Sequence, residues 1–165
     1  MTDQIIIQEA ARLVADGISV TFPVKGRSMI PFIIGGKESV ILQRPDNLKV
    51  GHVILAEVGP DRYVVHRIIR IDNESGRITL MGDGNIRGTE SCMQQQVLAR
   101  ATHVVDPQGR RRPLESRGQM FKARIWYWIR PFRRIILAVL RRTIRKYKIR
   151  KSRKYLCCAR CAVRT

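Results

Sequence analysis

The sequence predicts a mainly β fold: a compact, partly open β-barrel or coiled sheet with an N-terminal helix and C-terminal basic amphipathic helices. Three observations support this prediction. Short runs rich in β-branched residues recur between clusters of glycine, proline, aspartate and asparagine through residues 19–106. One amphipathic segment precedes these runs. The 165 residues also suffice for one small domain with its own core, followed by an appendage.

The helix comes first and the strands follow. Apolar residues recur at helical spacing over residues 3–16, and Gly17 stops the pattern, so a helix is expected there. Turn-forming residues at 72–76 predict a hairpin. Strands are expected near residues 19–25, 38–43, 52–58, 62–71, 77–81 and 96–105. Many short strands of this kind favour a barrel or a coiled sheet.

Charge divides the chain into two parts. Residues 1–109 hold 12 Lys+Arg and 12 Asp+Glu, whereas residues 110–165 hold 20 Lys+Arg and one acid, Glu115. The formal net charge of +19 therefore belongs to the second part. We predict a neutral domain at 1–109, made of the helix at 3–16 and a β core at 19–106, and a basic helical appendage with a tail at 110–165.

Three short motifs in the neutral part carry residues with possible chemistry. Ser28 lies in the sequence Gly-Arg-Ser-Met-Ile-Pro, in which the glycine permits unusual backbone angles and the proline fixes a turn. His66 lies in a β-branched run, and a Gly-Asp-Gly-Asn turn follows at residues 82–85. A serine on a rigid turn is suited to act as a nucleophile, and histidine is suited to act as its base near neutral pH. Taken singly, each motif also fits a serine in an ordinary loop or a structural histidine on a strand.

The ordered set of motifs, with strands between its members, resembles the catalytic region of the LexA-like and type I signal-peptidase superfamily. The resemblance covers residues 20–106 and is closest to the serine–histidine branch of archaeal and endoplasmic-reticulum signal peptidases. It implies a fold of the signal-peptidase type and a serine endopeptidase with Ser28 as nucleophile and His66 as general base. It further implies a peptide or protein substrate bound in extended conformation. We expect no cofactor and no metal.

The chain departs from the family pattern at two places. Lysine-type relatives carry a hydroxyl two residues before the nucleophile, where this chain has Gly26. The resemblance then implies that backbone N–H groups hold the oxyanion, with Gly26 and Met29 shaping the site. The second departure concerns the acid that orients His66. Thr89 stands at the family's position for it, so Asp83 or Glu90, the residue after Thr89, would have to supply the carboxylate. Asp83 can equally cap its own turn.

The basic appendage is predicted to lie on a membrane surface. Aromatic and aliphatic residues alternate with cations from about residue 120 to residue 151, and the longest apolar block, at 135–140, is too short to cross a bilayer. Such helices suit the headgroup region of an anionic membrane. A nucleic-acid interface and a solvated basic helix remain alternatives. The residues expected to contact lipid are Trp126, Trp128, Arg130, Arg133, Arg134, Arg141 and Arg142.

The remaining features concern location and other functions. Polar residues interrupt the N-terminal apolar pattern, so no signal peptide or membrane anchor is recognised there, and we expect a cytoplasmic protein that is peripheral on the inner face of the membrane. Cys157, Cys158 and Cys161 lack a fourth partner for a zinc site. Two other functions fit the sequence: a catalytically silent peptide- or partner-binding member of the same fold, and a nucleic-acid-binding regulator acting through the tail.

Overall fold

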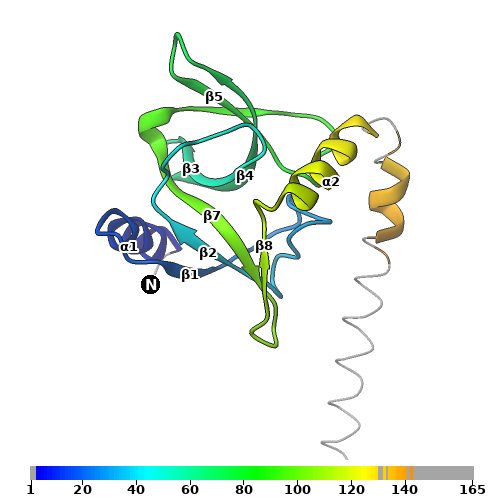
Figure 1. Ribbon diagram of the computed structural model, residues 1–165, viewed down its shortest axis with the longest axis horizontal. Helices are drawn as coiled ribbons and strands as arrows, with labels where there is room; N and C mark the ends of the chain where they lie inside the picture. The colour runs from blue at the N-terminus through cyan, green and yellow to red at the C-terminus, as the bar shows by residue number, and fades with distance from the viewer. Residues whose placement is uncertain (1–2, 130–131, 133, 141, 143–165) are drawn as a thin grey trace, which may run out of the picture. The chain divides into compact units, whose positions relative to one another are not determined.

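The computed structural model describes residues 3–129, 132, 134–140 and 142. The chain divides into two compact units after Ile129. In the second unit, residues 134–140 are helical. All other elements belong to the first unit, and most of them are labelled in Figure 1.

The first unit is one curled antiparallel sheet with a helix near each end of the unit. The strands pair in the order β1-β2-β7-β3-β4-β5-β6, and β8 adds to β7. β3 and β6 also contact each other although two strands separate them in this order, so the sheet coils without closing. The elements are α1 (Asp3–Ala15), β1 (Val20–Pro23), β2 (Ser39–Gln43), β3 (Val53–Gly59), β4 (Arg62–Asp72), β5 (Arg77–Met81), β6 (Glu90–Met93), the 3-10 helix η1 (Gln94–Gln96), β7 (Val97–Val105), β8 (Arg111–Pro113) and α2 (Arg117–Trp128).

This architecture confirms the predicted mainly β class. The predicted helix and strands begin and end within about two residues of the observed ones, but β6, η1 and β8 were not predicted. The residues of β3 explain why the sheet has two apolar faces. Val53 and Leu55 pack into one core cluster with α1, β1, β2 and β7, whereas Ile54 and Ala56 pack into a second cluster with β4, β5 and β6. The alternation follows from the two-residue period of a strand.

The compact unit extends beyond the composition boundary predicted at residue 109. β8 pairs with β7, as His103 faces Pro113, and α2 buries Ala123 and Trp126. The net charge of a segment describes the residues that face solvent. The boundary of the compact unit instead depends on the few apolar residues between those charges that pack inward. The basic residues of β8 and α2 are therefore part of the β domain.

None of the described helices is both long enough and apolar enough to span a membrane.

Candidate active site

Ser28 lies in a tight turn that follows β1. Gly26 has φ = 85°, a left-handed conformation that favours glycine, which explains the glycine two residues before the serine. Gly35, near the end of the same loop, packs against the Gly26 backbone, because a Cβ at Gly35 would stand 2.1 Å from the Gly26 carbonyl oxygen. The Met29 side chain is buried in the core and fixes the turn to the domain. Ser28 itself is half-buried. The chain thus holds the serine on a fixed rim.

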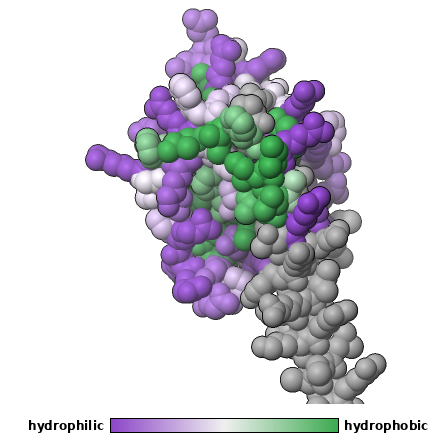
Figure 2. Space-filling model, turned by 90° about the vertical axis from the view of Figure 1, so that its right-hand side faces the viewer, coloured by the Kyte–Doolittle hydropathy of each residue, from purple (hydrophilic) through white to green (hydrophobic). Residues whose placement is uncertain are grey.

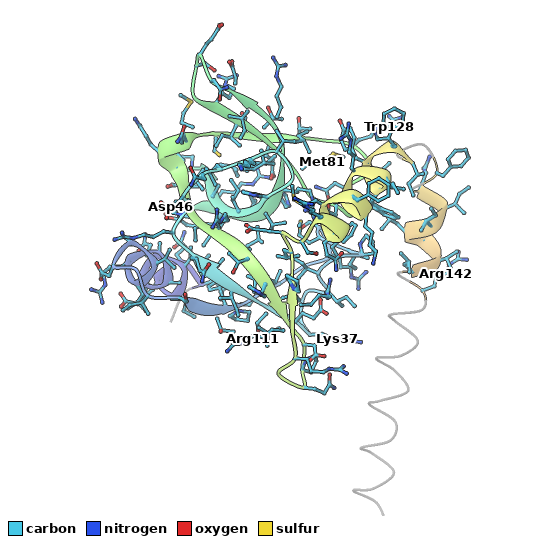
Figure 3. All side chains as sticks on the ribbon, viewed as in Figure 1. Lys37, Asp46, Met81, Arg111, Trp128 and Arg142 are labelled. Atoms are coloured by element: carbon cyan, nitrogen blue, oxygen red, sulfur yellow. The ribbon has the colours of Figure 1, made fainter. Side chains whose placement is uncertain are left out.

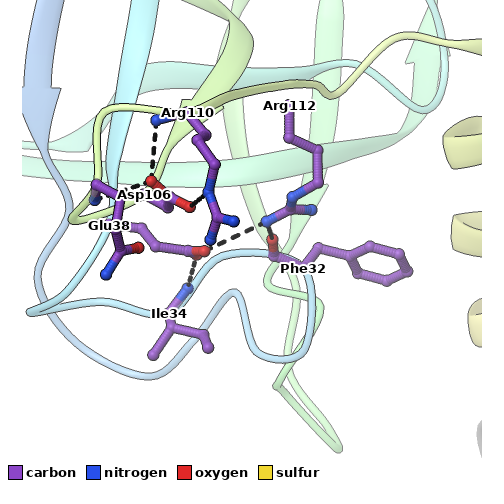
Figure 4. Close-up of polar contacts among 7 residues, drawn as sticks. Phe32, Ile34, Glu38, Asp106, Arg110 and Arg112 are labelled. Atoms are coloured by element: carbon purple, nitrogen blue, oxygen red, sulfur yellow. Dashed lines mark hydrogen bonds and ion pairs between the residues drawn. The ribbon is translucent and has the colours of Figure 1, made fainter.

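A network from β8 holds the end of the same loop. Glu38 accepts a hydrogen bond from the Ile34 N–H at 2.7 Å, and the Arg112 guanidinium donates to the Phe32 carbonyl at 2.8 Å. Arg112 also reaches Glu38 at 3.4 Å (Figure 4). Arg112, which the composition placed in the appendage, therefore helps to fix the segment that carries Ser28.

The register between β4 and β5 brings His66 to the serine turn. Arg67 pairs with Met81, so the next residue along, Gly82, comes alongside His66. A Cβ at Gly82 would lie 2.5 Å from the Ser28 carbonyl oxygen and 3.0 Å from His66 Nε2. The Gly84 N–H donates to the same Ser28 carbonyl at 2.6 Å. The glycine turn therefore sits between Ser28 and His66 and joins the two segments.

Glu90, the first residue of β6, faces the other nitrogen of the imidazole. Its Oε2 lies 2.7 Å from His66 Nδ1, and the same carboxylate pairs with Arg62. Burial lowers the pKa of His66 below its ordinary value of about 6.5, and the nearby Glu90 carboxylate partly opposes this shift. The imidazole consequently stays neutral, as a base must, to a lower pH than an exposed histidine would.

Asp83 does not face His66. Its carboxylate accepts hydrogen bonds from Arg67 at 2.9 Å (Nε) and 2.8 Å (Nη2), and both side chains are buried. Arg67 Nη1 also donates to the Gly51 carbonyl at 2.6 Å. Asp83 therefore neutralises a buried arginine, and the position predicted for it beside the histidine is held by Glu90.

Trp126 is buried against the same turn and is not available to lipid, contrary to the prediction from sequence. Its Nε1 donates to the Asp83 backbone carbonyl at 2.7 Å, and its ring meets Phe32 edge-on with centroids 6.4 Å apart. Arg67 lies 5.2 Å from the centre of the Phe32 ring. The cluster of Phe32, Arg67, Asp83 and Trp126 joins α2 to the serine loop and the histidine strand.

The other residues predicted to contact lipid fall into two groups. Trp128 is exposed at the end of α2 (Figure 3), and Arg134 and Arg142 are exposed in the second unit. Arg130, Arg133 and Arg141 lie outside the described residues.

A groove of about 320 Å³ opens beside Ser28. α1 and β1 contribute part of its lining. The first residues of β4, which pair with β3 but not with β5, contribute another part. Among the described strands, β1 pairs with β2 alone, so within this part of the chain its other edge is open. The lining includes Ile7, Phe22, Tyr63 and Val65. An extended segment can therefore meet both apolar side chains and open strand edges next to the serine.

Within the described part of the chain, no group of three or more His, Cys, Asp or Glu side chains is arranged to hold a metal ion. His52 is buried, and its Nδ1 accepts a hydrogen bond from the Lys49 N–H at 3.3 Å. His103 contacts the hydroxyl of Thr102. Both imidazoles therefore make local contacts that stabilise the fold.

The chain matches no family model, no curated protein and no solved structure.

Replacing Gly82 with alanine is expected to damage the site because the new methyl group overlaps the Ser28 carbonyl and crowds His66. A displacement of about 1 Å between nucleophile and base can cost on the order of 10²-fold in rate, and overpacking costs about 1–3 kcal/mol of stability. Peptide cleavage and thermal unfolding of Gly82→Ala measure both effects. Gly59→Ala is the matched control, because its Cβ meets open space. If Gly82→Ala cleaved peptide at the same rate as the wild type, this result would contradict the candidate site.

Proposed function

We propose that this protein is a serine endopeptidase similar to the signal peptidases, with Ser28 as nucleophile and His66 as general base. The arrangement around His66 carries the proposal. One imidazole nitrogen faces the Glu90 carboxylate, and the other faces the glycine turn that holds the Ser28 carbonyl. An acid, a histidine and a serine gathered around one turn are the components of a serine hydrolase site, and this set recurs on unrelated folds.

In this mechanism the Ser28 hydroxyl attacks a peptide carbonyl while His66 Nε2 accepts its proton. Glu90 stabilises the imidazolium and keeps Nδ1 protonated. The backbone N–H of Ser28 and one from a neighbouring loop hold the developing oxyanion. His66 then returns the proton to the leaving amine, and the acyl-enzyme is hydrolysed by water activated by the same imidazole.

The groove beside Ser28 suits an extended peptide. The open edges of β1 and β4 offer backbone N–H and C=O groups to a strand laid between them. The cavity is small and largely apolar, with Ile7, Phe22 and Val65 among its lining residues. It therefore favours substrates with small apolar side chains near the bond that is cut.

Cleavage of a peptide library, followed by mass spectrometry, tests this proposal. The wild-type chain is compared with Ser28→Ala, and Ser19→Ala serves as a control with an exposed serine before β1. Cuts by the wild type and by Ser19→Ala that disappear in Ser28→Ala support the proposal. The removal of the nucleophile abolishes covalent catalysis, whereas it leaves the fold intact. Equal cleavage by a folded Ser28→Ala would overturn it.

A catalytically silent peptide-binding protein is the second candidate, and one observation favours it. His66 Nδ1 and Glu90 Oε2 are close, but neither atom has a hydrogen bond of good geometry within the described residues. Peptide binding that persists in Ser28→Ala together with His66→Ala, in a chain that cuts no peptide, would favour this alternative.

We also propose that the protein associates with an anionic membrane surface on the cytoplasmic side. The net charge of +19 and the aromatic residues among the cations support this association. A nucleic acid is the alternative anionic partner.

A further inference from the structure

The outer face of α2 carries an apolar stripe where solvent-facing polar residues would be expected. Phe121, Ile125 and Trp128 are spaced by four and three residues, so they share one side of the helix. Their exposed fractions are 65%, 46% and 78%. The residues that α2 buries, Ala123 and Trp126, lie on the opposite side. The stripe is thus not the side that attaches α2 to the domain.

Cations border this stripe on both sides. Arg124 lies on one flank and Lys122 on the other, Arg117 occupies the first turn, and the sequence of α2 contains no acid. All three cations are exposed. Long basic side chains beside an apolar stripe can extend to lipid phosphates while the apolar groups enter the acyl region. An apolar stripe alone fits many partners, but this cationic border favours an anionic one.

An apolar groove extends the same surface onto the sheet. The groove, of about 620 Å³, is lined by α2, by the residues just before β3 and by the middle of β4. Phe121, Arg124 and Trp128 of α2 take part in this lining. Val50 lines its far side and is 54% exposed. The space-filling view shows exposed hydrophobic residues among hydrophilic ones on the face that it presents (Figure 2). Exposed apolar surface of this kind marks an interaction site.

We propose that the outer face of α2, formed by Phe121, Ile125 and Trp128, docks the peptidase-like domain onto anionic phospholipid membranes. The inference rests on the proposed membrane association and assigns it to one surface of the first unit. The same helix contacts the active-site region on its inner side, because Trp126 donates to the Asp83 carbonyl. Membrane docking of α2 therefore places the candidate active site close to the lipid surface.

The two tryptophans of the chain provide a local test. In a full-length Trp126→Phe variant, Trp128 is the sole tryptophan and reports on the outer face. In Trp128→Phe, the buried Trp126 reports instead. Both variants also carry Ser28→Ala, so that no self-cleavage occurs. With vesicles of phosphatidylglycerol and phosphatidylcholine, we expect Trp128 emission to shift to shorter wavelength and to be quenched by brominated acyl chains. Trp126 should show neither change.

Binding strength is tested with Phe121→Ser together with Ile125→Ser, compared with Ile18→Ser, which changes an exposed isoleucine before β1. The double variant is expected to bind vesicles ~10-fold more weakly or worse, and Ile18→Ser to bind like the parent. If Trp126→Phe does not fold, the difference in emission between the Ser28→Ala chain with both tryptophans and the same chain with Trp128→Phe gives the same signal.

Three outcomes would overturn the inference. Co-sedimentation with anionic vesicles while Trp128 remains unquenched would place lipid contact elsewhere and leave the membrane association standing. Absence of co-sedimentation would overturn the membrane association as well, without bearing on the peptidase proposal. Quenching of Trp128 by a single-stranded oligonucleotide but not by vesicles would assign the face to nucleic acid.

Discussion

Replacing Glu90 with glutamine is expected to lower kcat severely, by up to about 10⁴-fold, while the protein stays folded. Losses of this order accompany neutralisation of the acid in serine–histidine–aspartate triads. The physical reason is the 2.7 Å approach of Glu90 to His66 Nδ1, which favours the imidazolium that forms when Ser28 gives up its proton. An amide of the same shape offers no charge to this cation.

The pH dependence distinguishes an orienting acid from a residue that merely packs nearby. Burial lowers the pKa of His66, Glu90 and the more distant Asp83 raise it, and Arg62 lowers it further. Removing the Glu90 charge therefore moves the pKa of His66 still lower. We expect the acid limb of kcat/KM, below about pH 6.5 in the wild type, to shift to lower pH in Glu90→Gln. Glu74→Gln, which changes an exposed acid in a turn, should leave the limb and kcat unchanged.

An unshifted acid limb in Glu90→Gln would contradict the role assigned to Glu90, even if kcat fell. In that case the 2.7 Å contact would serve the fold only, and the imidazole would be held by its burial on β4.

Local patterns were enough to predict most of the sheet from the sequence. β-branched runs bounded by turn residues specified the main strands, since both signals act within a few residues. β6 and β8 were missed for the opposite reason. β6 has a single buried residue, Cys92, and β8 reads Arg-Arg-Pro, so neither carries an apolar alternation. These strands form because β5 and β7 each present an edge with which they can pair, and this tertiary context leaves no local sequence pattern.

The candidate site, like the sheet, could be predicted from the sequence only in part. Ser28, His66 and the glycine turn are recognisable as motifs, whereas the choice between Asp83 and Glu90 depends on how residues 82–89 return to the sheet. α2 presents a related ambiguity, because its spacing defines two apolar sides. Which side is buried depends on the Phe32 ring and the Asp83 carbonyl that meet Trp126, and both come from distant parts of the chain.

Asp83→Asn is expected to lower stability far more than it lowers catalysis. The substitution leaves the guanidinium of Arg67, which is 6% exposed, without a countercharge. Breaking a buried ion pair on one side costs about 3–5 kcal/mol, which corresponds to a fall in Tm on the order of 10 °C for a domain of this size. Thermal unfolding followed by circular dichroism measures this loss. Asp46→Asn, at an exposed aspartate, should leave Tm unchanged.

A second substitution separates charge from shape. Adding Arg67→Met to Asp83→Asn removes the uncompensated cation, so part of the lost stability should return. At a temperature where Asp83→Asn is folded, its acid limb should move much less than that of Glu90→Gln, because Asp83 contacts Arg67 and not the imidazole. The reverse result, an unchanged Tm with kcat lost, would make Asp83 the orienting acid. The two carboxylates are thus assigned by opposite responses: Glu90 through the titration of His66, and Asp83 through the stability of the turn that holds Ser28.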